Sequence, residues 1–201
     1  MQERDIKLLF DVLVHVPDMY QRSERIGSKE IHFITGMNDV SKTIRYGTVL
    51  EVPEYFDTNL KEGDIIYFHH NIVRRSVNNE GEYMHGPFEV DRTLGLYNCP
   101  LEEIYGVERD GRFFCLEPFC FIKPVKNDII KKQGKILTVE EVTEKPNIGI
   151  IRYGNSQLKG LGFNEGDQIV FKVDSEYEFT VRGEKLYRMT TNKILSHWYG
   201  S

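Results

Sequence analysis

The stretch Leu60–Phe68, with the sequence LKEGDIIYF, returns later in the chain as Phe163–Phe171, with the sequence FNEGDQIVF. Both stretches have an apolar residue, then Glu-Gly-Asp, then apolar residues at alternate positions that end in Phe. Their glycines, Gly63 and Gly166, stand 103 residues apart. Glycine accepts the positive φ of a tight turn, and alternation is typical of a strand with one buried face. The sequence therefore predicts the same turn and strand twice.

The residues that flank these two stretches repeat in the same order. Each half begins with an alternating stretch and continues with a glycine-led stretch, and after the turn a Leu-Tyr pair stands eight residues before an Ile. The first set is Asp11–Val16, Gly47–Val52 and Leu96 with Ile104, and the second is Phe119–Lys123, Gly149–Gly154 and Leu186 with Ile194. Landmarks that recur in one order indicate an internal repeat. We therefore expect a tandem duplication.

The chain as a whole is typical of an all-β protein. β-Branched and aromatic residues stand in short alternating runs, with Gly, Asn, Asp and Pro between them, and helical periodicity is nearly absent. Short helical turns are expected only over Cys99–Tyr105 and Thr190–Leu195. The expected fold is two small β-barrels, one over residues 1–112 with an insertion around 69–95, and one over residues 113–201. Because no Ser/Gly-rich linker separates the halves, they are expected to pack closely.

Composition limits the kinds of function that the chain can have. Of its 201 residues 28% are charged, and a net charge of −5 gives a surface that repels phosphate backbones, so we expect no nucleic-acid partner. The segment Met1–Asp5 lacks a signal peptide's apolar stretch, and no run approaches the ~18 apolar residues of a membrane helix. The three cysteines, Cys99, Cys115 and Cys120, have neither an even count nor a CxxC spacing. We therefore expect free thiols, no membrane association and a cytoplasmic protein.

Each half also carries a short apolar stretch with a Thr inside a polar region. These stretches are Ile31–Gly36, with the sequence IHFITG, and Gly134–Thr138, with the sequence GKILT. The resulting order of landmarks resembles that of the co-chaperonin (GroES) family. Its members have a first strand, a long polar loop with an apolar tripeptide and Thr, a Gly-x-Val strand, a Gly-Asp-x-Val-x-Phe strand and a last strand that leads into Ile-Leu. The resemblance spans almost the whole chain.

This resemblance implies both a fold and a function. The fold would be two tandem GroES-like small β-barrels. The function would be that of a co-chaperonin, a homo-oligomer that caps a chaperonin (GroEL-like) ring and assists protein folding. The family's glycine-rich roof hairpin has no room here, because Pro53–Leu60 and Asn155–Phe163 are both short. Some bacteriophage co-chaperonins are similar in this respect, which implies a viral origin and a location in the host cytoplasm.

The resemblance also assigns the partner-binding residues to two loops, Pro17–Thr43 and Lys126–Asn147. In the family, a flexible loop docks its apolar tripeptide into an apolar groove of the chaperonin. Burying each apolar side chain gives ~1.5–3 kcal/mol, whereas ordering the loop costs roughly 2–5 kcal/mol. Several loops on one ring compensate for the weak binding of each through avidity. The candidate residues are Ile31, Phe33, Ile34 and Thr35 in the first half, and Ile136, Leu137 and Thr138 in the second.

No catalytic or metal-binding residue is expected. The pairs Glu102-Glu103 and Glu140-Glu141 are interpreted as solvated turns, since no nucleophile is placed beside them. Alcohol dehydrogenases contain a barrel of this general fold, but they also need Gly-x-Gly-x-x-Gly, which this chain lacks. Adjacent histidines on a strand would point to opposite faces. We therefore expect that the chain is not an enzyme and holds no cofactor. The spacing of one set of potential metal ligands also matches no known metal-ligand pattern: His69, His70, His85 and Cys99.

Three alternatives remain open at this point. The alternation of Ile31, Phe33 and Ile34 also fits a core strand. The chain also fits a structural or assembly protein, for example a phage virion component built of two small β-barrels with no chaperonin partner. A third interpretation is a carbohydrate- or peptide-binding barrel that uses the aromatic insertion around Tyr83 and Phe88. Two barrels per chain also raise a question of stoichiometry, because a sevenfold ring has an odd number of places.

Overall fold

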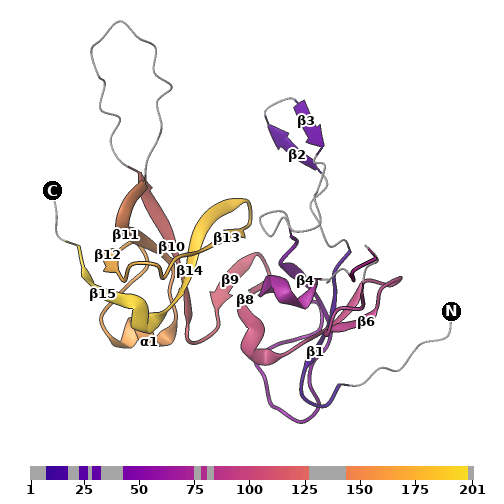
Figure 1. The fold of residues 1–201 in the computed structure, drawn as a ribbon. Coiled ribbons are helices and arrows are strands. Elements are labelled where there is room, and N and C mark those ends of the chain that lie inside the picture. The colour runs from indigo at the N-terminus through magenta and orange to yellow at the C-terminus, as the bar shows by residue number, and fades with distance from the viewer. Residues whose placement is uncertain are drawn as a thin grey trace, which may run out of the picture. The chain divides into compact units, whose positions relative to one another are not determined.

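A computed structural model describes residues 8–17, 23–26, 29–32, 43–74, 78–80, 84–126 and 144–198. Within these ranges the protein is predominantly β, and the all-β prediction is confirmed (Figure 1). The chain divides into two compact units, Met1–Phe113 and Phe114–Ser201.

The first unit is built on a seven-stranded sheet with the order β6-β7-β1-β4-β5-β8-β9. A separate two-stranded sheet pairs β2 (Ser23–Ile26) with β3 (Lys29–His32). Two short 3₁₀ helices, η2 (His70–Ile72) and η3 (Leu101–Glu103), join strands of the main sheet. The strands of that sheet are β1 (Val12–His15), β4 (Tyr46–Glu51), β5 (Ile65–Phe68), β6 (Glu89–Asp91), β7 (Leu96–Cys99), β8 (Ile104–Arg109) and β9 (Arg112–Cys115).

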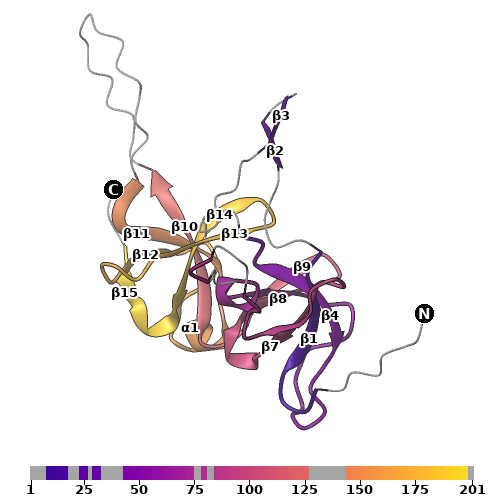
Figure 2. The same ribbon diagram turned by 45° about the vertical axis from the view of Figure 1, so that its right-hand side comes forward.

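The second unit is built on a six-stranded sheet with the order β13-β14-β10-β11-β12-β15 (Figure 2). It contains the α-helix α1 (Ser156–Gly160) and the 3₁₀ helix η4 (Thr191–Lys193). Both predicted helical turns are confirmed, because η3 and η4 lie inside the predicted ranges. The strands are β10 (Phe119–Lys126), β11 (Glu144–Tyr153), β12 (Gln168–Phe171), β13 (Tyr177–Val181), β14 (Glu184–Thr190) and β15 (Ile194–His197).

The helix α1 was missed by the sequence analysis, which expected helical turns only before the last strands. Its N-cap is Asn155, whose side chain accepts a hydrogen bond from the backbone N–H of Leu158 at 2.9 Å. Asparagine is among the best N-cap residues, so this signal was present in the sequence. The helix buries Leu158, which is 1% exposed, against the core of the second sheet.

The two sheets have the same strand order. Reading across the first sheet from β6 to β8, each strand has its counterpart in the second, in the order β13, β14, β10, β11, β12 and β15. Irregularities of register also recur, between Leu13 and Val14 on β1 and between Phe121 and Ile122 on β10. A second pair of irregularities lies just before Phe68 on β5 and just before Phe171 on β12. The landmarks that repeat in the sequence therefore occupy equivalent places in two similar sheets.

The turn at the repeated Glu-Gly-Asp is also the same in both units. The glycines have positive φ, 85° at Gly63 and 94° at Gly166. Asp64 Oδ2 accepts the backbone N–H of Lys61 at 2.8 Å, and Asp167 Oδ2 accepts that of Asn164 at 2.8 Å. The backbone N–H of each glycine donates to the strand behind it, at 2.9 Å for the first turn and 2.8 Å for the second. Because both turns have the same geometry, this short motif identifies the equivalent turn and strand in the two units.

Neither sheet closes on itself among the described residues. The first ends in β6 and β9, and the second ends in β13 and β15. The finer expectation, two small barrels, therefore stays a prediction. Each sheet nevertheless has a well-formed apolar core, with Phe68 and Ile66 fully buried in the first unit and Phe121 and Phe179 fully buried in the second.

In each unit one glycine, Gly47 of β4 or Gly149 of β11, faces its neighbouring strand too closely to leave room for a Cβ. A Cβ added to Gly47 would lie 2.7 Å from the carbonyl oxygen of His15, and one added to Gly149 would overlap the side chain of Ile122 and lie 3.0 Å from the carbonyl oxygen of Lys123. We expect Gly149→Ala to cost ~1–3 kcal/mol of unfolding free energy, because backbone and core must shift. Denaturant unfolding measures this cost.

The matched control for this prediction is Gly160→Ala in α1. A Cβ added there meets nothing within 4 Å, and alanine favours a helix over glycine by about 1 kcal/mol. The control is therefore expected to be neutral or stabilising. Equal losses of stability for both variants would contradict the assigned close approach.

Candidate partner-binding site

The structure describes one of the seven predicted partner-binding residues. Ile31 lies in β3, in register with Glu24 of β2, and this strand belongs to the separate two-stranded sheet instead of the main sheet of its unit. The other six lie outside the described residues: Phe33, Ile34, Thr35, Ile136, Leu137 and Thr138.

The two segments that carry these residues leave equivalent places in the two sheets. The first connecting segment, residues 18–42, joins β1 to β4, and the second connecting segment, residues 127–143, joins β10 to β11. Since β10 and β11 are the counterparts of β1 and β4, both segments extend from the same end of the same strand pair. The predicted loop bounds need correction within the described residues: the loop Pro17–Thr43 contains the strands β2 and β3, and the loop Lys126–Asn147 is shorter, because Lys126 belongs to β10 and Glu144–Asn147 belong to β11.

The base of the first connecting segment is fixed by backbone hydrogen bonds. The N–H of Val16 donates to the carbonyl of Gly95 at 2.8 Å, and the N–H of Phe68 donates to the carbonyl of Arg45 at 3.0 Å. Val16 is 2% exposed and Arg45 is 9% exposed. Gly95 has φ 65°, and a Cβ added there would overlap the carbonyl oxygen of Val16. Both ends of the segment therefore start from packed positions.

The base of the second connecting segment is fixed by side chains. Lys126 pairs in register with Glu144, the first residue of β11. The Glu144 carboxylate accepts hydrogen bonds from the hydroxyl of Tyr187 and, at 3.2 Å, from Lys185 Nζ, and Lys185 also pairs with Glu178 at 3.1 Å. The hydrogen bond from Tyr187 lowers the pKa of Glu144, and burial together with this bond raises the pKa of Tyr187 to about 12. At neutral pH the tyrosine is thus protonated and the glutamate is charged, which is the pairing that the hydrogen bond needs.

A shallow cavity at the first Glu-Gly-Asp turn is already occupied by an internal ion pair. The turn residues 61–65 and the residues 108–111 line it. Arg109 donates to both carboxylate oxygens of Asp64 at 2.6 Å and to the carbonyl of Asn59 at 2.7 Å. A bidentate pair of this kind is strong and geometrically fixed. The ion pair therefore stabilises the turn, and its two charged groups are already paired with each other.

This ion pair predicts an acid dependence of stability. The hydrogen bond from Arg109 lowers the pKa of Asp64, whose side chain is 2% exposed. A carboxylate with a lowered folded-state pKa stabilises above the unfolded value of about 3.9, and this stabilisation is lost as the pH falls through the folded value. We expect Asp64→Asn to lower the thermal midpoint at pH 7, and we expect the two proteins to converge once the pH has fallen below the lowered folded-state pKa of Asp64. Asp167→Asn is the control, because the Asp167 side chain is 33% exposed and its carboxylate lies 3.8 Å from His197 Nδ1 where Asp64 has a bidentate arginine, so it should cause a smaller loss. A constant difference between Asp64→Asn and the wild type down to the lowest pH would contradict this account.

The histidines of the insertion are arranged differently from the expectation. His69 and His70 do not lie on a strand, because β5 ends at Phe68 and η2 begins at His70. Their rings lie 4.1 Å apart, and burial lowers the pKa of His70 to about 4. The Nδ1 of His69 accepts the backbone N–H of Asn71 as an N-cap. In the described part of the chain, no three His, Cys, Asp or Glu side chains are grouped as a metal site requires.

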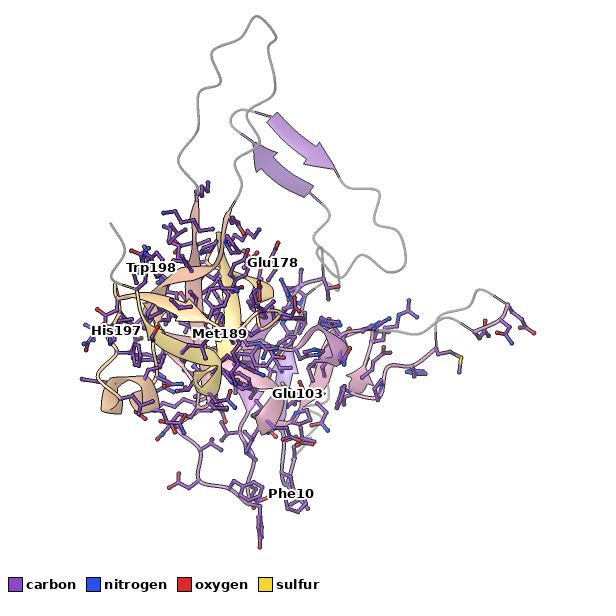
Figure 3. All side chains as sticks on the ribbon, turned by 60° about the vertical axis from the view of Figure 1, so that its left-hand side comes forward. Phe10, Glu103, Glu178, Met189, His197 and Trp198 are labelled. Carbon is purple, nitrogen blue, oxygen red and sulfur yellow. The ribbon has the colours of Figure 1, made fainter. Side chains whose placement is uncertain are left out.

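An exposed aromatic cluster was missed by the sequence analysis. Phe10, Tyr55 and Phe56 have ring centroids 5.4–6.0 Å apart and are 52%, 72% and 47% exposed. Figure 3 shows Phe10 projecting from the body of its unit. The cluster precedes β1 and follows β4, so it lies at the opposite end of this strand pair from the first connecting segment. Two adjacent aromatic residues, Tyr55 and Phe56, in an otherwise polar loop could have indicated this cluster from the sequence.

Comparison with known proteins assigns the chain to no family. No protein-family model matches its sequence. No characterised protein matches it significantly. Within the described ranges, no helix is both long and apolar enough to cross a membrane.

Proposed function

We propose that the chain is a co-chaperonin that caps a chaperonin ring and assists protein folding, with each unit a small GroES-like β-barrel. One observation carries the proposal: the two candidate binding segments extend from the same place in two sheets of the same strand order. A repeated attachment point with an apolar-Thr sequence in each copy favours two binding segments of one kind. The proposed partner is a GroEL-like ring in the cytoplasm of a bacteriophage host.

The energetics of such segments suit a cap that must leave its partner. Ile136 and Leu137 each contribute ~1.5–3 kcal/mol when buried in an apolar groove. Ordering of the segment offsets roughly 2–5 kcal/mol of this gain, so one segment alone binds weakly. Several copies bound to one ring gain avidity, because each further segment binds at high effective concentration. Weak single contacts and strong multiple contacts together permit both capture and release.

The fixed bases of the segments support the same function. The packed positions of Val16 and Arg45 and the hydrogen bonds of Glu144 hold the segment ends in the sheets. Ends that are already ordered lose no further entropy on binding, which lowers the entropic cost of binding. The sheets thus act as a platform that presents the segments at set positions.

Protease footprinting with and without a chaperonin ring tests this proposal. The protein is treated with trypsin alone, with the ring, and with the ring and nucleotide, and the cut sites are identified by mass spectrometry. We expect cleavage after Lys131, Lys132 and Lys135 to be suppressed only when ring and nucleotide are both present. Cleavage after Lys159, in α1 of the second unit, is the internal control and should not change. Equal cleavage at all of these sites in every condition would contradict the proposal.

A second candidate function is that of a structural or assembly component without a chaperonin partner. The exposed cluster of Phe10, Tyr55 and Phe56 favours it, because contiguous apolar surface is typical of protein interfaces. In that case Phe10→Ser with Tyr55→Ser should abolish assembly, while variants of the two connecting segments should not. The same footprinting would then show no protection by the ring.

A further inference from the structure

The exposed aromatic cluster of the first unit is not required by the fold of its sheet. In the second unit the connection after β11 occupies the equivalent place, and residues 154–162 contain no aromatic side chain. That connection forms α1 and turns an apolar side chain inward, since Leu158 is 1% exposed. The first unit anchors its own connection through Leu60, which is 6% exposed. A sheet of this strand order therefore forms without exposed rings, and the cluster points to a role outside the core.

Backbone hydrogen bonds hold the cluster in place. The N–H of Tyr55 donates to the carbonyl of Leu9 at 3.0 Å, directly before Phe10 in the chain. The N–H of Glu54 donates to the carbonyl of Leu8 at 3.1 Å. The three rings of the cluster contact one another at interplanar angles of 55–87°, and Figure 3 shows Phe10 pointing away from the body of its unit. Rings that are already ordered lose little entropy when a partner binds.

Each ring of the cluster stands next to an acidic residue in the chain. The three pairs are Phe10-Asp11, Glu54-Tyr55 and Phe56-Asp57, and both Glu54 and Asp57 are exposed. Residues 8–14 and 50–60 contain no Lys, Arg or His. Carboxylates attract a cation, and the negative face of an aromatic ring attracts it as well. The surface around the cluster is therefore suited to cationic groups.

The exposed area of the cluster suits a short segment better than a second copy of the chain. An aromatic side chain has about 150–250 Å² of surface, so exposed fractions of 52%, 72% and 47% leave roughly 250–430 Å² of the three rings in water. A stable dimer buries about 800 Å² of each partner. Two copies that meet at this surface would also bring like charges together, which opposes self-association. Area and charge together favour a short cationic segment.

We propose that the aromatic cluster and its acidic neighbours bind a segment of another protein that carries Lys or Arg beside apolar side chains. The cationic head groups of the segment pair with Glu54 and Asp57, while their aliphatic stems and the apolar side chains lie on the rings. Nucleic acids and anionic lipid surfaces are disfavoured, because the same carboxylates repel phosphate groups. The cluster lies at the opposite end of the strand pair from the first connecting segment, so it binds independently of the contact proposed above.

Peptide binding to the full-length protein tests this proposal without a chaperonin, so its outcome is independent of the proposed function. The probe is a fluorescently labelled peptide in which Leu and Arg alternate, and binding is measured by anisotropy. We expect the wild type to bind it, and Phe10→Ser with Tyr55→Ser to weaken binding at least about tenfold. A peptide with Glu in place of Arg should not bind. Leu161→Ser with Val173→Ser is the matched control, because it removes exposed apolar side chains of the second unit and should bind like the wild type.

A charge variant separates the effect of the carboxylates from that of the rings. Glu54→Gln with Asp57→Asn keeps the cluster and is expected to weaken binding several-fold and to reduce its dependence on salt, because fewer charges remain to be screened. Failure of the wild type to bind, or equal binding by the wild type and Phe10→Ser with Tyr55→Ser, would overturn the proposal. Equal binding of the Glu peptide would do the same. A lower mass of the free protein in light scattering when the rings are replaced would assign the cluster to a second copy and overturn the proposal as well.

Discussion

Replacing Ile136 and Leu137 by Ser should abolish stable binding to a chaperonin ring while leaving the fold intact. Each side chain contributes ~1.5–3 kcal/mol when buried, so one segment loses about 3–6 kcal/mol. Because 1.4 kcal/mol corresponds to a factor of ten, the affinity of a single segment falls by roughly 10²–10⁴. In a cap with several segments the loss is larger, since every copy carries the change. Binding is measured with immobilised chaperonin in the presence of nucleotide.

The control for this variant replaces two other exposed apolar residues. Leu161 and Val173 are 67% and 68% exposed in the second unit, and their replacement by Ser removes similar apolar surface. This variant should bind like the wild type. Phe33→Ser with Ile34→Ser tests the first connecting segment in the same assay. Unchanged binding by both segment variants would refute the assigned residues, even if the protein binds the ring.

Phe68→Ala and Phe171→Ala should each lower the unfolding free energy by about 3–5 kcal/mol. The two side chains are 0% and 2% exposed, and each follows the same irregularity of register at the end of its strand. Truncation leaves a cavity in a packed core, and the cost combines the lost burial with the cavity itself. Such a loss is a large part of the stability of an ordinary domain. Urea unfolding followed by circular dichroism measures it.

Phe114→Ala is the control for these core variants, because Phe114 is 51% exposed. Its replacement is expected to change stability by less than about 1 kcal/mol. If the two units unfold in separate transitions, Phe68→Ala should shift one and Phe171→Ala the other. A cost below about 1 kcal/mol for either core variant would contradict the equivalence of the two positions.

The repeated strands were predictable because their signals are local. Glu-Gly-Asp followed by alternate apolar residues predicts a glycine with positive φ and then a half-buried strand. Both features depend only on residues that are close together in the sequence. Gly63 and Gly166 satisfy them in the same way. The attachment of both connecting segments to one kind of strand pair followed from the order of these landmarks.

Other features depend on packing between distant residues and could not be derived from local patterns. The exposed cluster joins Phe10 to Tyr55 through tertiary contact. The bond of Tyr187 to Glu144 likewise joins β14 to the start of β11. The prediction that His69 and His70 lie on a strand was wrong for a simpler reason. The end of a strand depends on backbone hydrogen bonding, which the alternation of apolar and polar residues does not reveal. The helix α1 could have been predicted from the sequence, because Asn155 is a strong N-cap residue.

Gel filtration of the protein with a chaperonin ring tests the central claim most directly. The protein is mixed with the ring, with and without nucleotide, and the column fractions are assayed for both chains. We predict that the protein elutes with the ring when nucleotide is present and separately when it is absent. Separate elution under every nucleotide condition, with an established co-chaperonin eluting with the same ring in parallel, would contradict the claim that this chain caps chaperonins.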